Sequence, residues 1–177
     1  MRMRVAIFVD GANMFYAQRD NGWHIDYKKV YDHFTKGREI WGAYYFTGTP
    51  PYDNITEIKE YRAFRGALIH IGYYVVDKEA KIITDRTTGS RTLKANLDVE
   101  ITLHIMATMG SYDEIIFLGG DSDFAPLIKH LRENGKHVIC VGRRQSTARE
   151  LINVSNKFID LNEIKDEIEK IKGEAII

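Results

Sequence analysis

Unbroken apolar runs that end at glycine or aspartate constrain this fold more than any other feature of the sequence. They cover residues 5–9, 115–118 and 138–141. Apolar runs that do not alternate with polar residues are typical of strands buried on both faces, as in the centre of a parallel sheet. Residues 40–46 and 73–76 give two weaker strand signals. The sequence therefore predicts a mostly parallel sheet.

Helical segments separate these runs. Parallel strands need a crossover of about a dozen residues, usually a helix. Residues 97–109 are therefore predicted to be helical, although residues 97–105 alternate between apolar and polar side chains as a strand does. Residues 80–95 carry two strand-like stretches around a glycine and predict a β-hairpin. The predicted helices cover residues 27–34, 54–69, 97–109, 124–133, 147–154 and 162–172. Strands and helices alternate, which defines an α/β fold.

Composition narrows the class of protein. The 177 residues and the apolar fraction of 44% predict one compact domain with room for a short extension. Lysine plus arginine number 25, as do aspartate plus glutamate, which excludes a chain that is basic over its whole surface. The only cysteine, Cys140, excludes a disulfide within the chain. The first apolar run is too short for a signal peptide or a membrane span, so we expect a cytoplasmic protein without membrane contact.

Two acidic motifs stand where predicted strands end. Asp10 follows the strand at 5–9, and Asp121 and Asp123 follow the strand at 115–118. Ligands of open α/β sheets bind outside the carboxyl ends of the strands. Carboxylates gathered there repel one another unless a cation joins them, and oxygen-rich sites suit Mg²⁺ or Mn²⁺. Such aspartates can also be simple helix caps, but two strand-end motifs, one of them a paired Asp-x-Asp, favour the metal site.

Three motifs carry a resemblance to a known family. They are Val-Asp-Gly-Ala-Asn at 9–13, Leu-Asp-Val-Glu at 97–100 and Gly-Gly-Asp-Ser-Asp-Phe at 119–124. Because of the order and spacing of these motifs, the chain resembles the NYN domain, a branch of the PIN-like nuclease superfamily. Within that domain family it resembles the LabA-like subgroup. The resemblance covers about residues 4–161. It implies a Rossmann-like three-layer α/β/α fold, an acidic cluster that binds Mg²⁺ or Mn²⁺, and a role in RNA processing and degradation.

The resemblance also assigns roles to individual residues. The family aspartates fall on Asp10, Asp98, Asp121 and Asp123. This implies that the four act both as catalytic residues and as metal ligands. Asn13 falls on the family asparagine, where it would hydrogen-bond a metal water or a phosphate, and Lys94 stands where many relatives have a lysine for the scissile phosphate. The plainer roles are helix capping for Asn13 and a solvated side chain for Lys94.

The chain departs from the family toward its C-terminus. Relatives usually carry an aspartate where this chain has Asn156, so Asn156 is not expected to bind metal. Ser122 and Thr147 are candidates to line the site, although such hydroxyls also serve as hydrogen-bond partners within turns. The expected organisation is an NYN domain over residues 1–161 and a helical extension over residues 162–177, packed on the domain or trailing from it.

Basic residues gather in two places where RNA would need them. Residues 86–94 carry a net charge of +3 and include Arg91 and Lys94. Arg143 and Arg144 follow another predicted strand, at the sheet edge that holds the acids. Because phosphate contacts supply much of the affinity for nucleic acids, we expect Arg91, Arg143 and Arg144 to bind the substrate.

The expected partner is single-stranded RNA. Aromatic side chains stack on unpaired bases, and the candidates in polar surroundings are Tyr16, Trp23 and Tyr52. A homodimer is also compatible with a small domain rich in surface aromatics.

Three functions compete. The preferred hypothesis is a metal-dependent, PIN-like endoribonuclease in which water attacks the phosphodiester in line. The alternative from another class is a regulatory RNA- or protein-binding module with weak or no catalysis. The third is a phosphatase of the haloacid-dehalogenase type, which needs a second aspartate two residues after the first, where this chain has Ala12.

Overall fold

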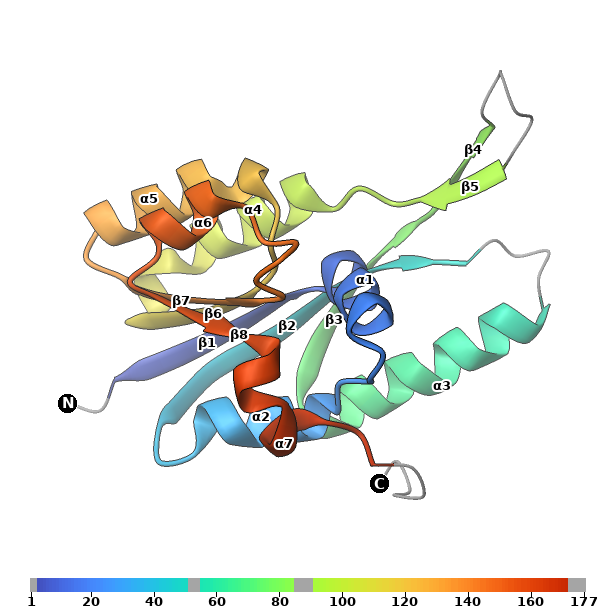
Figure 1. Cartoon of the computed structure of the whole chain (residues 1–177), viewed down its shortest axis with the longest axis horizontal. Coiled ribbons are helices and arrows are strands. Elements are labelled where there is room, and N and C mark those ends of the chain that lie inside the picture. Colours follow the sequence, from blue (N-terminus) through green and yellow to red (C-terminus); the bar gives the residue numbers. More distant parts are fainter. Residues whose placement is uncertain (1–2, 51–54, 85–90, 172–177) are drawn as a thin grey trace.

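A six-stranded sheet forms the centre of the protein, which the computed structural model describes over residues 3–50, 55–84 and 91–171. Every strand runs parallel to its neighbours, in the order β3-β2-β1-β6-β7-β8 (Figure 1). The strands are β1 (Arg4–Asp10), β2 (Glu39–Thr49), β3 (Tyr73–Glu79), β6 (Glu114–Leu118), β7 (His137–Gly142) and β8 (Lys157–Asp160). The predicted α/β fold with a parallel sheet is confirmed.

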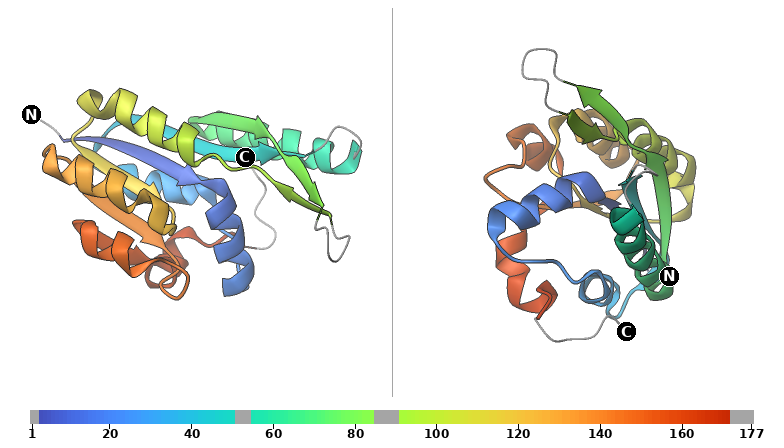
Figure 2. Two further views of the ribbon diagram at one scale, coloured as in Figure 1. Left: turned by 90° about the horizontal axis from the view of Figure 1, so that it is seen from above. Right: turned by 90° about the vertical axis from the view of Figure 1, so that its right-hand side faces the viewer.

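Helices cover both faces of this sheet and give three layers (Figure 2). One face carries α1 (Gly11–Asn21), α2 (Tyr27–Thr35), α3 (Ile55–Ile71) and α7 (Lys165–Ile168). The other carries α4 (Asp98–Thr108), α5 (Ala125–Glu133) and α6 (Arg149–Val154). Among the described residues, three short 3-10 turns adjoin these helices: η1 (Met109–Ser111) follows α4, η2 (Ser122–Phe124) precedes α5 and η3 (Leu161–Ile164) precedes α7. Within the described ranges, no helix has the length and apolarity to cross a bilayer.

The unbroken apolar runs are explained by burial on both faces. In β1, Val5, Ile7 and Val9 join the core under α1, α2 and α3, whereas Ala6 and Phe8 join the core under α4 and α5. None of these five side chains is exposed to solvent. A strand with a core on each side has no polar face, which is why β1 and β6 show no alternation.

A β-hairpin leaves the sheet after β3, as predicted. Strands β4 (Lys81–Thr84) and β5 (Arg91–Lys94) pair antiparallel. The hairpin projects beyond the carboxyl ends of β2 and β3 (Figure 1). Residues 85–90 lie outside the described part of the chain.

The C-terminal part differs from the sequence-based expectation. Strand β8 was not predicted, because a four-residue edge strand that begins with lysine and ends with aspartate gives little apolar signal. The helix predicted over 162–172 is confined to η3 and the single turn of α7. It stops because the following backbone pairs with the segment before α2: the Lys170 N–H donates to the His24 carbonyl, and the Asp26 N–H donates to the Ile168 carbonyl.

The strand order reverses at the centre of the sheet. The chain first builds outward from β1 through β2 to β3, then returns to the other side of β1 with β6 and continues to β8. Asp10 ends β1, and Gly119 to Asp121 follow β6. In open α/β sheets the crevice at such a switch point, outside the carboxyl ends of the strands, is the usual place for a ligand.

Candidate active site

Asp10 joins the central strand to the first helix. Its backbone is still extended, and its side chain caps α1 by accepting a hydrogen bond from the Asn13 N–H at 3.1 Å. The next residue has to be glycine. A Cβ atom on Gly11 would lie 2.4 Å from the Phe46 carbonyl oxygen and 2.7 Å from the Tyr45 ring. The close approach of α1 to β2 therefore fixes where the Asp10 carboxylate stands.

The Asp10 carboxylate is held in an environment that disfavours its charge. Burial raises its pKa from 3.8 to about 6, against the lowering effect of the Asn13 N–H, and the negative charges of Asp98 and Asp121 raise it further. Three predicted site residues from three separate elements therefore lie within electrostatic range of one another. They are the last residue of β1, the first residue of α4 and the residue that precedes η2.

Asp121 is positioned by a tight turn after β6. The Gly119 N–H donates to the Val141 carbonyl, and the Gly120 carbonyl accepts from the Ala148 N–H. A Cβ atom on Gly120 would lie 3.0 Å from Thr147 Oγ1 and 3.3 Å from Asn13 Oδ1. The Asn13 side chain therefore reaches from α1 to the turn that carries Asp121, which places it beside the acidic residues.

Asp98 opens α4, the helix predicted against the local alternating pattern. Its N–H donates to Asn96 Oδ1 at 2.9 Å, and its side chain is partly buried. Two residues further, Glu100 forms an ion pair with Lys78 of β3, with Nζ and Oε1 2.6 Å apart. These contacts tie the start of α4 to the end of β3, at the carboxyl edge of the sheet where β1 also ends.

Asp123 and Ser122 occupy the exposed face of η2. The Asp123 N–H donates to Asp121 Oδ1 at 3.0 Å, so the two aspartates share one turn. Asp123 is not among the main causes of the raised pKa of Asp10, unlike Asp98 and Asp121. Within the described ranges, no three His, Cys, Asp or Glu side chains are arranged as a ready metal cage.

An open arrangement of oxygen donors is compatible with Mg²⁺. Mg²⁺ in proteins usually keeps several waters and is held by one or two carboxylates together with substrate phosphates. The pKa of Asp10 is raised first by burial and then by the negative charges of Asp98 and Asp121, and a bound cation would relieve both effects. The residues that meet here supply hard oxygen donors, which are the donors that Mg²⁺ and Mn²⁺ prefer.

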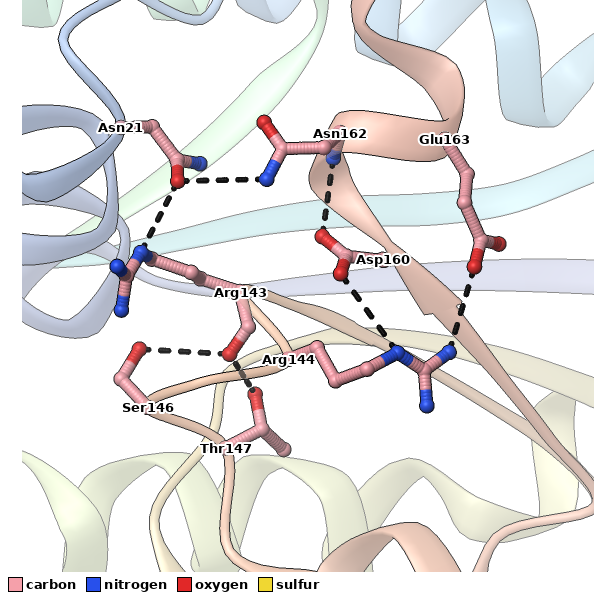
Figure 3. A network of polar contacts seen from close by, with 8 residues as sticks. All are labelled: Asn21, Arg143, Arg144, Ser146, Thr147, Asp160, Asn162 and Glu163. Atoms are coloured by element: carbon pink, nitrogen blue, oxygen red, sulfur yellow. Dashed lines mark hydrogen bonds and ion pairs between the residues drawn. The ribbon is translucent and has the colours of Figure 1, made fainter.

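The two arginines after β7 have different surroundings (Figure 3). Arg144 forms ion pairs with Asp160 at 3.7 Å and Glu163 at 3.3 Å, and its guanidinium lies over the Phe158 ring. Arg143 donates from Nε to Asn21 Oδ1 at 3.0 Å (Figure 3), and among the described residues its two Nη atoms have no hydrogen-bond or ion-pair partner. The charge of Arg144 is thus offset by two acids, whereas Arg143 keeps donors for an external anion.

The remaining residues that the sequence analysis discussed divide into three groups. Thr147 donates to the Arg143 carbonyl within a turn, and Asn156 accepts from the Val138 N–H, so both have structural hydrogen bonds. Trp23 was wrongly expected to stack on bases: it is 6% exposed and donates to Asn162. The side chains of Arg91 and Lys94, and all of Tyr52, lie outside the described part of the structure, and their roles stay predictions.

Sequence reasoning missed a cavity beside the acids. It has a volume of about 760 Å³ and lies between α1, the end of β2 and α3. Gly11 and Ala12, the two residues after Asp10, form part of its wall. The sequence signal for this cavity is the helical spacing of Gly11, Met14 and Ala17, which are the buried residues of α1. Phe15 and Tyr16 therefore face away from the core.

Comparison with known proteins places the chain in a family. The NYN domain model matches residues 4–162. The "Low amplitude and bright protein LabA" of Synechococcus elongatus is 41% identical over 170 residues, which cover 94% of this chain and 88% of that protein. An uncharacterized protein of Methanocaldococcus jannaschii is 22% identical over 162 residues, 90% of this chain and 56% of its own length.

A solved structure shares the fold. The crystal structure of a protein of unknown function from Vibrio parahaemolyticus aligns with a TM-score of 0.75 and 23% sequence identity. The alignment covers 96% of this chain and 97% of that one. With the domain match and the 41% identical relative, the resemblance drawn from the three motifs is confirmed: the chain belongs to the NYN-domain family.

Proposed function

We propose that this protein is a metal-dependent endoribonuclease that hydrolyses RNA phosphodiesters at the carboxyl end of its sheet. One observation carries the proposal: Asp10, Asp98 and Asp121, from three separate elements, come within electrostatic range of one another at the carboxyl end of the sheet. Carboxylates crowded at a switch point are unfavourable for the protein alone and useful for holding a cation against a phosphate. Membership in the NYN family, with its PIN-like fold, supports the same chemistry.

Asp10, Asp98 and Asp121 would hold the ion, with Asp123 adjoining from η2. When bound, Mg²⁺ or Mn²⁺ would supply charge stabilisation at the scissile phosphate and acidify a water for the attack. The partial burial of Asp10 lowers the dielectric around it, which strengthens its attraction for a cation.

Other side chains would hold the RNA. Asn13 lies beside Gly120 and offers an uncharged amide next to the acids. Its Nδ2 can donate to a phosphate oxygen, while its Oδ1 can accept from an ordered water. Arg143 would bind a neighbouring phosphate through its Nη atoms, and Arg144 would contribute little because Asp160 and Glu163 already pair with it.

A regulatory RNA- or protein-binding module is the second candidate. The observation in its favour is that the described residues include no preformed group of three metal-ligating side chains. A phosphatase of the haloacid-dehalogenase type lacks the second aspartate that its chemistry requires, because Ala12 stands at that position.

An RNA-cleavage assay separates these functions. We expect purified protein with Mn²⁺ or Mg²⁺ to cut single-stranded RNA internally, and Asp10→Asn to cut at least about a hundredfold more slowly, in the range seen when a main catalytic group is removed. Asparagine keeps the helix-capping oxygen, so the variant should fold. Asp166→Asn on α7 is the matched control, since that residue is exposed and outside the site. Equal cleavage by wild type and Asp10→Asn would overturn the proposal.

A further inference from the structure

The cavity beside Asp10 is not used by the acid cluster itself. Its wall begins with Gly11 and Ala12 and continues along α1 to Phe15 and Tyr16. A volume of about 760 Å³ is within the range of small-molecule sites. An occupant of this cavity would therefore sit next to whatever is bound at Asp10.

Three of the aromatic side chains that line this cavity are unusually exposed, whereas Tyr27 and Tyr45 are buried. Phe15 is 61% exposed, Tyr16 50% and Phe64 37%, although large aromatic side chains are usually highly buried. The rings of Phe15 and Tyr16 meet edge to face, 5.6 Å apart, and Phe64 packs edge-on against Tyr45 at 5.5 Å. Ring faces that are left open to solvent are the platforms on which unpaired bases stack.

Polar groups frame these rings. The Arg19 guanidinium lies over the Tyr16 ring, 5.0 Å from its centre. Lys170 and His24 line the cavity and are exposed. The combination of aromatic walls, a lysine in the lining and the adjoining carboxylates that are proposed to bind metal matches the parts of a nucleotide: a flat base attached to an anionic backbone.

We propose that this cavity binds an unpaired base of single-stranded RNA, next to the phosphodiester positioned at Asp10. The inference rests on the proposed function, because it takes RNA as the ligand of the adjoining acids. Bases within a duplex stay stacked and cannot enter such a pocket. The pocket would therefore make the protein select single strands, and Phe15 is a specificity-determining residue.

Binding measurements test this pocket. The experiment uses Asp10→Asn protein, which should bind RNA without cutting it, and follows the fluorescence anisotropy of a labelled single-stranded decamer in Mg²⁺. Adding Phe15→Ala should weaken binding by at least about fivefold, the lower end for loss of one stacking contact. Adding Phe15→Tyr keeps a ring and should restore the affinity. Leu103→Ala on α4 is the matched control, since Leu103 is 62% exposed on the other face of the sheet.

A second arm identifies the base as the ligand. Replacing nucleotides one at a time by abasic units should weaken binding at one position of the decamer, and the Phe15→Ala protein should be insensitive at that position. If Phe15→Ala binds as tightly as its parent, or if no abasic position matters, the pocket proposal is wrong whatever the cleavage result. If wild type fails to cleave while these losses are seen, the base pocket stands and the nuclease proposal falls.

Discussion

The charge of Asp10 is unfavourable in the folded protein. Its folded-state pKa of about 6 lies above the ordinary value of 3.8 because the group is buried near Asp98 and Asp121. A carboxyl group with a raised pKa binds its proton more tightly in the folded state, so folding is favoured at low pH and loses that benefit as the pH rises. The loss should occur between about pH 4 and pH 6.

We predict that Asp10→Asn stabilises the protein when chelator is present. At pH 8 its free energy of unfolding should exceed that of wild type by about 3 kcal/mol, the equivalent of roughly two pKa units, and the difference should vanish near pH 4. Urea unfolding at several pH values measures it, with Asp166→Asn as control. Added Mn²⁺ should stabilise wild type more than the variant. A variant less stable than wild type at pH 8 would make Asp10 a structural residue.

Arg143 and Arg144 differ in what they offer to RNA. We predict that Arg143→Ala lowers the slope of log affinity against log salt by about 0.7 for single-stranded RNA, the loss of one phosphate contact. Arg144→Ala should change the slope much less, because Asp160 and Glu163 already offset that charge. Titrations of labelled RNA at several salt concentrations measure both. Equal slopes for Arg143→Ala and wild type would remove Arg143 from the RNA path.

At the scale of elements, the start of α1 positions the site. Gly11 packs against the β2 backbone at a distance that leaves no room for a side chain. In contrast, Gly66 of α3 has nothing within 4 Å of the place where its Cβ atom would be. The two glycines therefore form a matched pair for the same substitution.

We predict opposite effects of alanine at these two glycines. Gly11→Ala should lower the free energy of unfolding by about 2 kcal/mol, because the Phe46 carbonyl cannot move aside without displacing β2. Gly66→Ala should raise it by about 0.5–1 kcal/mol, through the better helix propensity of alanine. Urea denaturation of both variants measures this. An unchanged free energy of unfolding in Gly11→Ala would mean that α1 can shift, and that its packing against β2 does not fix the position of Asp10.

The elements that sequence could predict are those with a strong local or topological reason. The central strands were predicted because they are apolar on both faces, and α4 because two parallel strands require a helical crossover. Strand β8 was missed because it is short and lies at the edge of the sheet. The helix predicted over residues 162–172 was too long because its end depends on backbone pairing with residues 24–26. Asp10 and Asp121 were predicted from their places after apolar strands, and Asp98 from the resemblance to the NYN domain, whereas Phe15 could not be told from a core residue without knowing its face.

At the scale of the whole molecule, the two ends of the sheet serve different purposes. The carboxyl ends carry the acids and the cavity, and the amino ends carry a polar cluster built around one buried carboxylate. Glu114, the first residue of β6, is 2% exposed. Its Oε1 accepts from Arg38, and its Oε2 lies 2.7 Å from His137 Nδ1. This cluster joins the starts of β2, β6 and β7 far from the candidate site.

We predict that Glu114→Gln affects stability without affecting the site. Loss of the charge-assisted hydrogen bonds should lower the free energy of unfolding by about 2 kcal/mol. Affinity for RNA and the cleavage rate of the folded protein should stay unchanged, because the site lies at the opposite end of the sheet. Urea unfolding and RNA titration measure the two effects separately. A drop in RNA affinity equal to that of Arg143→Ala would show that the two ends are coupled.

The chemistry of the cut ends tests the nuclease proposal most directly. Hydrolysis by water at this site, with the new bond to phosphorus formed from water and the bond to the 3′ oxygen broken, leaves a 5′-phosphate and a 3′-hydroxyl. The measurement is mass spectrometry of fragments from one single-stranded RNA incubated with Mn²⁺ and wild-type or Asp10→Asn protein. We predict 5′-phosphate and 3′-hydroxyl fragments with wild type and almost none with Asp10→Asn. Fragments with 2′,3′-cyclic phosphates, or equal amounts from both proteins, would contradict the assignment of these acids to RNA hydrolysis.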